Sequence, residues 1–263
     1  MRPARFSTLA RVGRNMSTVT EIRDALYRGD FFLEYLPIVN LEDSRCFGGE
    51  ALIRWRRGSR IIPPLQFIPL IENTPVSGLV TYWVIDTVAH ELASWLRAHD
   101  GSHLAINVPP EVFGRGGLEY AAAKSDLLDL ADKFILEVTE RGVPDKLGVD
   151  ELNSRPYRRV LIALDDVCAG DASFLVASQV RVDILKLEKS CVDQITRGEL
   201  SSSETVALSS LIRAAKVCVI AEGVETSAQV EQLRNAGIGM GQGWLFSHPL
   251  CAADFMEYFS AHR

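Results

Sequence analysis

The amino-acid sequence predicts an α/β fold, a (β/α)8 barrel of the TIM type, and three observations lead to this prediction. From residue 103 onward, short runs of strand-forming residues alternate with helical stretches, which is the pattern of parallel βα units. About eight strands fit into roughly 245 residues, close to the usual length of such a barrel. Polar side chains recur where the strands end. A doubly wound open sheet is the alternative, and no internal repeat or low-complexity linker indicates a second domain.

The chain begins with a basic stretch. Residues 1–19 contain Arg2, Arg5, Arg11 and Arg14 and no acidic side chain, and they lack the continuous apolar run of a signal peptide. We expect residues 1–19 to be a disordered leader, or translation to start at Met16, and we expect residues 20–263 to form a single barrel domain.

The first ordered elements are predicted to be a helix, a β-hairpin and a long helix. Thr18 and Glu21 have the spacing of a capping box, and Gly29 suits the end of the first helix. The segments FFLEYLPIV and CFGGEALIRW then predict two strands, joined by a connection of hairpin length. In TPVSGLVTYWVIDTVAHELASWLRAHD, apolar residues repeat with a period near 3.6 between Val80 and Leu96, which predicts a helix.

The rest of the chain alternates between the two kinds of element. Strands are predicted at HLAINV, KFILEVTE, RVLIALDD, VDILKLE, VCVIAEGV and, as a short last strand, GQGWLF. Helices are predicted at GLEYAAAKSDLLDLA, DKLGVDELNSRPYR, ASFLVAS, SSSETVALSSLIRAAK, SAQVEQLRNAG and CAADFMEYFSAHR.

Polar side chains gather at the ends of these strands. Glu50 lies in the second strand, with Arg54 four residues further on. The later strands end at or near Asn107, Glu137, Glu140, Asp165, Asp166, Lys186, Glu222, Glu225 and Gln242. Because the carboxyl ends of parallel barrel strands meet at one face, where active sites lie, we expect these side chains to be neighbours.

The charges in this group favour a metal site. Five carboxylates at one end of the barrel would repel one another, and the single charge of Lys186 cannot offset five negative charges. These carboxylates belong to Glu50, Glu137, Asp165, Asp166 and Glu222. Oxygen ligands suit Mg²⁺, Mn²⁺ or Ca²⁺, and two adjacent aspartates suit a pair of ions about 3.5–4 Å apart. Such a pair would activate a water for in-line attack on phosphorus. Any one of these carboxylates, taken alone, is more often a helix cap or a surface charge.

Composition narrows the classes of function. The 263 residues are 47% hydrophobic, enough for one sizeable core or two small ones, and the formal net charge is −6. No basic stripe follows the first residues, which argues against binding of a nucleic-acid polymer. The five widely spaced cysteines indicate reduced thiols in a cytoplasmic protein. No apolar run is long enough to span a membrane.

Eight segments resemble a known family, in the family's order, over about residues 20–257. They are GGEALIRW, PLQFIPLIENT, AINVPPEVF, LEVTERG, ALDDVCAG, VDILKLEKS, VIAEGVET and QGWLFSHPL. The chain resembles the EAL-domain phosphodiesterases of bacterial cyclic di-GMP. The resemblance implies a barrel whose first strand runs antiparallel to the others. It also implies hydrolysis of cyclic di-GMP to linear pGpG with two Mg²⁺ or Mn²⁺ ions, inhibition by Ca²⁺, and a homodimer.

The resemblance also implies roles for single residues. Those similar to the ligands of the first metal are Glu50, Asn107, Glu137 and Asp165, and those around the second are Asp165, Asp166 and Glu222. Lys186 resembles the residue that contacts the attacking water, and with Glu50 and Glu222 it makes up the expected catalytic set. Expected substrate contacts are Arg54 and Asp183, and expected supporting residues are Glu140, Glu225 and Gln242.

Three departures from the family pattern leave the activity open. The two aspartates are followed by Val-Cys-Ala-Gly where the family usually has Phe-Gly-Thr-Gly, so Cys168 would strain a backbone that needs glycine. Leu36 stands in place of a glutamine, and Glu188 in place of an aspartate. The chain is therefore an active phosphodiesterase of reduced turnover, a cyclic di-GMP receptor, or a protein-interaction module, and regulation would come from a protein partner, dimerisation or expression level.

Overall fold

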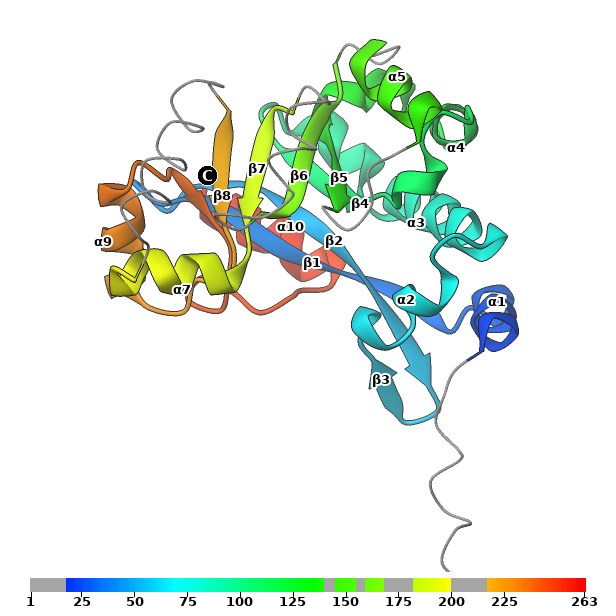
Figure 1. Ribbon diagram of the computed structural model, residues 1–263, viewed down its shortest axis with the longest axis horizontal. Coiled ribbons are helices and arrows are strands. Elements are labelled where there is room, and N and C mark those ends of the chain that lie inside the picture. Colours follow the sequence, from blue (N-terminus) through cyan, green and yellow to red (C-terminus); the bar gives the residue numbers. More distant parts are fainter. Residues whose placement is uncertain (1–17, 140–144, 155–158, 168–181, 200–216) are drawn as a thin grey trace, which may run out of the picture.

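A closed eight-stranded barrel forms the centre of the computed structural model, which describes residues 18–139, 145–154, 159–167, 182–199 and 217–263 (Figure 1). The strand order is β1-β9-β8-β7-β6-β5-β4-β2, and a further pairing of β1 with β2 closes the ring. The barrel strands are β1 (Phe31–Asn40), β2 (Cys46–Arg57), β4 (His103–Asn107), β5 (Phe134–Thr139), β6 (Leu161–Val167), β7 (Ile184–Leu187), β8 (Cys218–Ala221) and β9 (Met240–Gly241). This confirms the predicted barrel rather than the open sheet.

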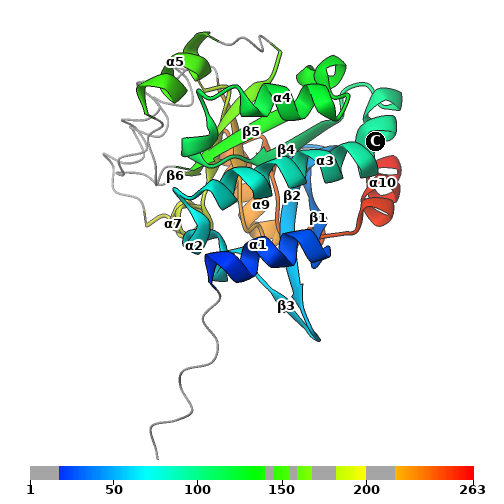
Figure 2. The same cartoon turned by 90° about the vertical axis from the view of Figure 1, so that its right-hand side faces the viewer.

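Strand direction follows the expectation for the first strand. β1 pairs antiparallel with both β2 and β9, whereas every other pair of neighbours in the ring is parallel. β1 and β2 are long and continue past the ring, and β3 (Arg60–Ile62) pairs with the outer end of β2. The outer parts of these strands project from the barrel in both views (Figures 1 and 2).

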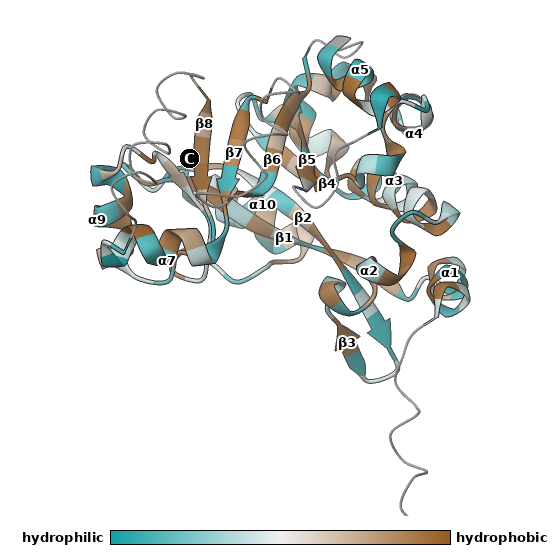
Figure 3. Ribbon diagram, viewed as in Figure 1, coloured by the Kyte–Doolittle hydropathy of each residue, from teal (hydrophilic) through white to brown (hydrophobic). Residues whose placement is uncertain are grey.

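Helices surround the barrel and bury its outer face. They are α1 (Val19–Arg28), α2 (Ile68–Ile71), α3 (Pro75–Ala98), α4 (Gly117–Lys124), α5 (Lys146–Ser154), α7 (Lys189–Arg197), α9 (Ser227–Asn235) and α10 (Ala252–Ala261). Three short 3₁₀ helices add Pro64–Gln66, Pro110–Val112 and Leu128–Lys133. Hydrophobic residues concentrate on the barrel strands and on the helix faces turned toward them (Figure 3).

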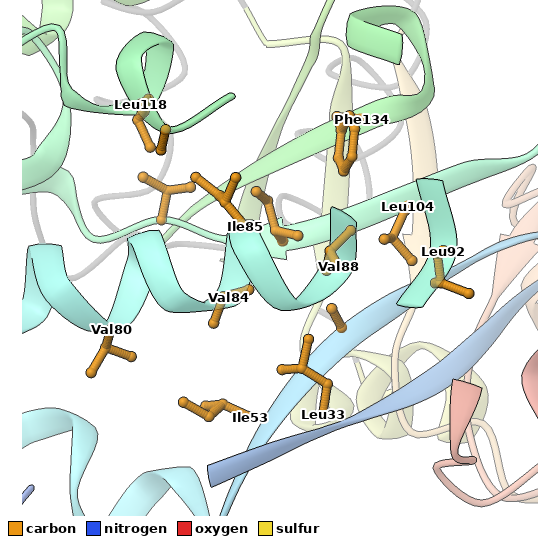
Figure 4. Close-up of a cluster of buried hydrophobic side chains, with 14 of the residues drawn as sticks. Leu33, Ile53, Val80, Val84, Ile85, Val88, Leu92, Leu104, Leu118 and Phe134 are labelled. Atoms are coloured by element: carbon orange, nitrogen blue, oxygen red, sulfur yellow. The ribbon is translucent and has the colours of Figure 1, made fainter. Parts of the chain in front are cut away.

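The long helix α3 supplies much of the outer core. One face of α3 packs its aliphatic side chains on β1, β2 and β4 (Figure 4), and Val88 and Leu92 are fully buried there. Leu33 and Ile53 meet this face from the hairpin, and Phe134 meets it from β5. The predicted 3.6-residue period of this helix therefore matches the stripe that it buries.

Inside the barrel lies a separate apolar layer. It takes one residue from each of seven strands, namely Ile38, Ala105, Ile135, Ala163, Ile184, Ile220 and Met240. Five larger side chains and two alanines make up this layer, so the interior is filled rather than open. This layer is the floor on which the candidate site rests.

The predicted ends of the first helix are confirmed. The Thr18 side chain accepts a hydrogen bond from the Glu21 backbone N–H at 3.1 Å, and Gly29 ends the helix with φ of 75°. The predicted helix at residues 117–131 instead splits into α4 and a 3₁₀ helix, because Asp126 between them has a positive φ of 56°.

The short last strand was predicted too late in the chain. GQGWLF was expected to be a strand, but β9 is Met240–Gly241 and residues 244–246 form a turn in which the Phe246 N–H donates to the Gly243 carbonyl. β9 pairs with only Val39 and Asn40 of β1, so the ladder ends early. α2, α7 and β3 were not predicted, and of these α2 and β3 span only four and three residues.

Several predictions fall outside the described residues. These concern the leader at residues 1–17, Glu140, the segment from Cys168 to Gly170, and the helices expected at ASFLVAS and SSSETVALSSLIRAAK. Among the described helices, none is both long enough and apolar enough to cross a membrane.

Candidate active site

A polar layer lies two residues beyond the apolar floor along strands β4 to β9. Side chains on a strand alternate between its faces, so residues two apart point the same way. The apolar residues of β4 to β9 are each followed two positions later by a polar one, in order Asn107, Glu137, Asp165, Lys186, Glu222 and Gln242. β2 adds Glu50, and the antiparallel β1 adds Leu36, which pairs with Glu50. Closure of the barrel thus gathers these seven polar residues, all of which the sequence singled out.

Lys186 is the centre of this layer. Its side chain is 1% exposed, and its Nζ lies 2.8 Å from Glu137 and from Glu222, 3.0 Å from Glu50 and 3.1 Å from Asp165. Four carboxylates therefore surround one ammonium group. If all were ionised, three negative charges would remain uncompensated in a buried place, which is strongly unfavourable.

Glu50 is held by donors from three strands. Its Oε1 accepts a hydrogen bond of 2.9 Å from Asn107 Nδ2, and its Oε2 accepts bonds from Gln242 Nε2 at 2.7 Å and from Lys186 at 3.0 Å. Gln242 Nε2 also donates to Glu222 Oε1 at 3.0 Å. Gln242 therefore links the two acidic side chains of Glu50 and Glu222.

Other carboxylate oxygens of the cluster lack a donor. Both oxygens of Glu137, which is fully buried, and Oδ1 of Asp165 have no hydrogen-bonding partner among the described residues, although Lys186 lies close enough to Glu137 and Asp165 for an ion pair. Buried charges of this kind are normally paired or coordinate a metal. Carboxylate oxygens are the hard ligands that Mg²⁺, Mn²⁺ and Ca²⁺ prefer. The residues present therefore fit such an ion.

A local irregularity turns both adjacent aspartates into the mouth. In a regular strand, Asp165 and Asp166 would point to opposite faces. The pairing of β6 with β7 shifts register between Leu164 and Val167, and Asp166 has a positive φ of 55°. As a result, Asp165, Asp166 and Glu222 each offer an oxygen within 4.8 Å of the others. A β-bulge beside a site is a common way to re-aim a side chain.

Burial and mutual repulsion change the acidity of this cluster. Burial, with the charges of Glu50 and Asp165 nearby, raises the pKa of Glu137 well above its ordinary value. Burial likewise raises the pKa of Glu222 to about 8. At neutral pH the metal-free cluster therefore holds protons that an arriving cation would displace.

The pKa values of Glu50 and Lys186 shift in the directions that keep both side chains charged. Burial alone would raise the pKa of Glu50, but attraction to Lys186 and hydrogen bonds from Gln242, Lys186 and Asn107 bring it below its ordinary value. Burial alone would lower the pKa of Lys186, but the surrounding carboxylates raise it well above the usual value. The two form the ionised pair at the centre of the site.

A cavity of about 560 Å³ opens from the cluster toward α2 and α3. Glu50, Asn107, Asp165 and Asp166 line its inner end. Its walls are largely apolar and include Leu52, Leu65, Ile68, Pro69, Val80, Val84, Pro109 and Pro110. A concave, mostly apolar space with a few convergent polar groups is the usual form of a small-molecule site.

Three expected site residues lie apart from the cluster. Arg54 Nε donates to Glu34 Oε2 at 2.7 Å on the projecting part of the hairpin. Glu225 is on the surface, where Lys189 Nζ lies 3.1 Å from it. Asp183 precedes β7, and its Oδ2 accepts a hydrogen bond from the Ile162 backbone N–H at the amino end of β6. The structure thus gives Asp183 and Glu225 contacts away from the acidic cluster.

Sequence reasoning did not single out the polar groups of the cavity wall. Glu111 Oε1 accepts hydrogen bonds from the Asn73 backbone N–H at 2.8 Å and from the Ser77 hydroxyl at 2.7 Å, which fixes the turn before α3. Arg115, also on the wall, donates to Asp145 Oδ2 at 2.8 Å. Glu111 and Asn73 lie in segments that resemble the family, but no spacing pairs them, because each of these pairings joins segments about thirty or more positions apart.

Sequence comparison identifies similar proteins. The EAL domain family matches residues 19–249. The chain is 34% identical over 252 residues to the probable cyclic di-GMP phosphodiesterase PdeB of Escherichia coli (strain K12). The aligned region covers 92% of this chain and 47% of that protein. It is 31% identical over 257 residues to the probable cyclic di-GMP phosphodiesterase PdeD of the same organism, covering 94% and 47%. The chain spans about half the length of these curated relatives.

Solved structures agree with the sequence comparison. The fold is similar to that of the EAL enzyme Bd1971 in its cAMP and cyclic-di-GMP bound form, with a TM-score of 0.80, 28% identity, and coverage of 92% of this chain and 68% of that one. It is also similar to the PaMucR phosphodiesterase in complex with c-di-GMP, with a TM-score of 0.77, 29% identity, and coverage of 90% and 98%. With its barrel, its antiparallel first strand and its ring of acidic residues, the chain belongs to the EAL domain family.

Proposed function

We propose that this chain is a phosphodiesterase that hydrolyses cyclic di-GMP to linear pGpG and depends on two divalent cations, Mg²⁺ or Mn²⁺. The observation that supports this most is the buried cluster of carboxylates around Lys186, in which both oxygens of Glu137 and Oδ1 of Asp165 have no hydrogen-bonding partner among the described residues beyond their ion pairs with Lys186. The names of the relatives and the ligands of the similar structures point to the same substrate.

The acidic layer would hold the cations. The proposed ligands are Glu50, Asn107, Glu137, Asp165, Asp166 and Glu222. When bound, the cations would supply Lewis-acid activation of a water and neutralise charge on the phosphate. Gln242 would position Glu50 and Glu222 through its two hydrogen bonds. The expected role of Glu140 in holding the loop after the aspartates stays a prediction.

Lys186 would act on the reacting atoms. Its ammonium group is buried and fixed by four carboxylates, so it needs no reorganisation before the reaction. We assign it to orienting the attacking water and stabilising the charge that develops on the phosphate oxygens. Arg54, on the same face of β2 as Glu50, would grip a phosphate of the substrate. The expected roles of Asp183 as a substrate contact and of Glu225 as a supporting residue stay predictions.

A receptor without turnover is the second candidate, and Leu36 favours it. Leu36 is the apolar member of the polar layer and lies directly opposite Glu50 in the hairpin. Its side chain can neither donate to a phosphate nor hold a water. A chain that binds cyclic di-GMP tightly and releases no product would fit this substitution.

One assay separates the two. Purified protein is incubated with cyclic di-GMP and Mg²⁺ or Mn²⁺, pGpG is followed by chromatography, and nucleotide binding is measured with Ca²⁺, which we expect to inhibit turnover. Product formation that disappears in Glu50→Ala supports the phosphodiesterase. Binding without product supports the receptor. Neither binding nor product would contradict both and leave a protein-interaction module.

The wider setting is part of the same proposal. We place the protein in the cytoplasm as a homodimer whose activity a protein partner regulates. Sedimentation of the purified chain tests the dimer, and a single monomeric species at micromolar concentration would contradict it.

A further inference from the structure

The hairpin arm carries the arginine proposed to bind phosphate. We use the name hairpin arm for residues 31–35 of β1 together with residues 52–62, which comprise the outer end of β2, the turn after it and β3. The hairpin arm projects from the barrel (Figures 1 and 2). Glu50, Leu52 and Arg54 share one face of β2, and Glu50 and Leu52 line the cavity. Arg54 is therefore the next side chain on the face that leads out of the site.

Arg54 is held by two acceptors, one at Nε and one at Nη1, which lie on opposite flanks of its guanidinium group. Nε donates to Glu34 Oε2 at 2.7 Å, and Nη1 donates to the Ile53 carbonyl at 3.1 Å. Both side chains of the ion pair are partly shielded, with 15% of Arg54 and 27% of Glu34 exposed. Nη2 has no hydrogen-bonding partner in the described part of the chain, and Nη1 keeps a second hydrogen.

This pattern presents one edge of the guanidinium to a ligand. An arginine binds phosphate best through two parallel N–H donors of its fork. Because Glu34 takes the Nε side, the edge formed by Nη1 and Nη2 stays available. Glu34 can hold this orientation because it faces Leu52 across the hairpin, which makes it a diagonal neighbour of Arg54 on the same face.

We propose that Glu34 is a positioning residue for substrate binding, which orients Arg54 toward a phosphate of the substrate without touching the substrate itself. The inference deepens the proposed function and rests on it, since it takes the ligand to be a cyclic dinucleotide. An arginine ordered before binding loses less conformational entropy when the ligand arrives. The contribution of Glu34 is therefore to affinity rather than to the chemical step.

Substitution of Glu34 should separate affinity from turnover. Glu34→Ala frees Arg54, so we expect KM for cyclic di-GMP, and Kd measured with Ca²⁺, to rise about tenfold while kcat stays within about twofold. Glu34→Gln keeps an oxygen acceptor for Nε, so it should recover most of the affinity. A role in folding alone would lower kcat through loss of active protein and would not be rescued in this way.

A double-mutant cycle shows whether Glu34 acts through Arg54. Arg54→Ala should weaken binding more than Glu34→Ala does, and adding Glu34→Ala to Arg54→Ala should change Kd no further. Glu21→Gln is the matched control. Glu21 makes a comparable ion pair with Arg57 of the same arm, at 2.6 Å, and Arg57 lies on the other face of β2. We expect its Kd and KM to equal those of the unaltered chain.

Different outcomes reject different statements. If the unaltered chain binds cyclic di-GMP and Glu34→Ala binds equally well, the inference is wrong and the proposed function is untouched. Tighter binding by Glu34→Ala would also reject it, because Glu34 would then compete with the phosphate. Additive losses in the double mutant would show that Glu34 acts independently of Arg54. If the unaltered chain fails to bind, the proposed function fails, and the inference fails with it.

Discussion

The barrel interior contains two neighbouring layers with opposite chemistry. In the lower layer, Ile135, Ala163 and Ile184 fill the centre with apolar side chains. Two residues further along the same strands, Glu137, Asp165 and Lys186 fill it with charge at the same depth of burial. The lower layer stabilises the fold, whereas the upper layer costs stability unless a cation or a proton compensates it. Two residues along each of these strands therefore separate the apolar layer from the charged layer of the candidate site.

The largest effect should follow removal of Glu50. It is held by three donors from different strands and is a proposed metal ligand, so Glu50→Ala should lower turnover by about 1,000-fold or more. Chromatography of pGpG measures this. Because Glu50→Ala also leaves the donors of Asn107, Lys186 and Gln242 without this acceptor, circular dichroism of the variant checks that it is folded. A variant that keeps its turnover would break the assignment of the upper layer to chemistry.

Lys186 should matter for the reaction more than for binding. Lys186→Ala is expected to lower kcat by about 100-fold while Kd for cyclic di-GMP with Ca²⁺ changes little, since its role begins when the water attacks. Single-turnover kinetics with saturating Mg²⁺ measure the first quantity. Unchanged kcat would remove Lys186 from the mechanism.

A substitution in the lower layer should reduce stability more than it reduces turnover. Ile184 is 2% exposed and lies two residues before Lys186 on β7. Ile184→Ala should reduce the free energy of unfolding by about 3 kcal/mol through lost burial and a cavity. Urea unfolding measures this, and kcat per folded molecule should change far less than in Lys186→Ala. Equal losses in both measurements would show that the two layers are not separable.

The raised pKa of Glu222 predicts that the stability contributed by the upper layer depends on pH. The pKa of Glu222 is raised from 4.5 to about 8, so between these values the folded metal-free protein binds more protons than the unfolded chain. By linkage, its contribution to stability falls as pH rises through this interval. The melting temperature of the unaltered chain, relative to Glu222→Gln, should therefore decline from pH 5 to pH 8 with chelator present. Saturating Mg²⁺ should abolish the decline, and a rise with pH would contradict the direction.

The smallest effect is expected at Leu36. Leu36→Gln would complete the upper layer with a polar side chain opposite Glu50. We expect a gain of a few-fold in kcat/KM, of the size of one added hydrogen bond to a bound phosphate or water. No gain would show that the layer works with one apolar member, and the receptor candidate would lose its main support.

Much of the fold could be predicted because its signals are local. The cap at Thr18, the period of α3 and the alternation of strands and helices depend on residues a few positions apart. The polar strand ends were also visible, and the barrel prediction alone implied that they meet. The boundary of β9 was wrong, since the ladder there ends where its partner strand stops pairing.

The sequence by itself determined which residue types stand at the strand ends, and their oxygen-rich character indicated a hard-cation site. Tertiary structure alone decided that Lys186 reaches four carboxylates, that a bulge turns Asp166 inward beside Asp165, and that Glu34 holds Arg54. It also placed Asp183 and Glu225 away from the cluster. The reason is physical: these contacts join positions far apart in the chain, and only closure of the barrel and the register of its strands fix which side chains face one another.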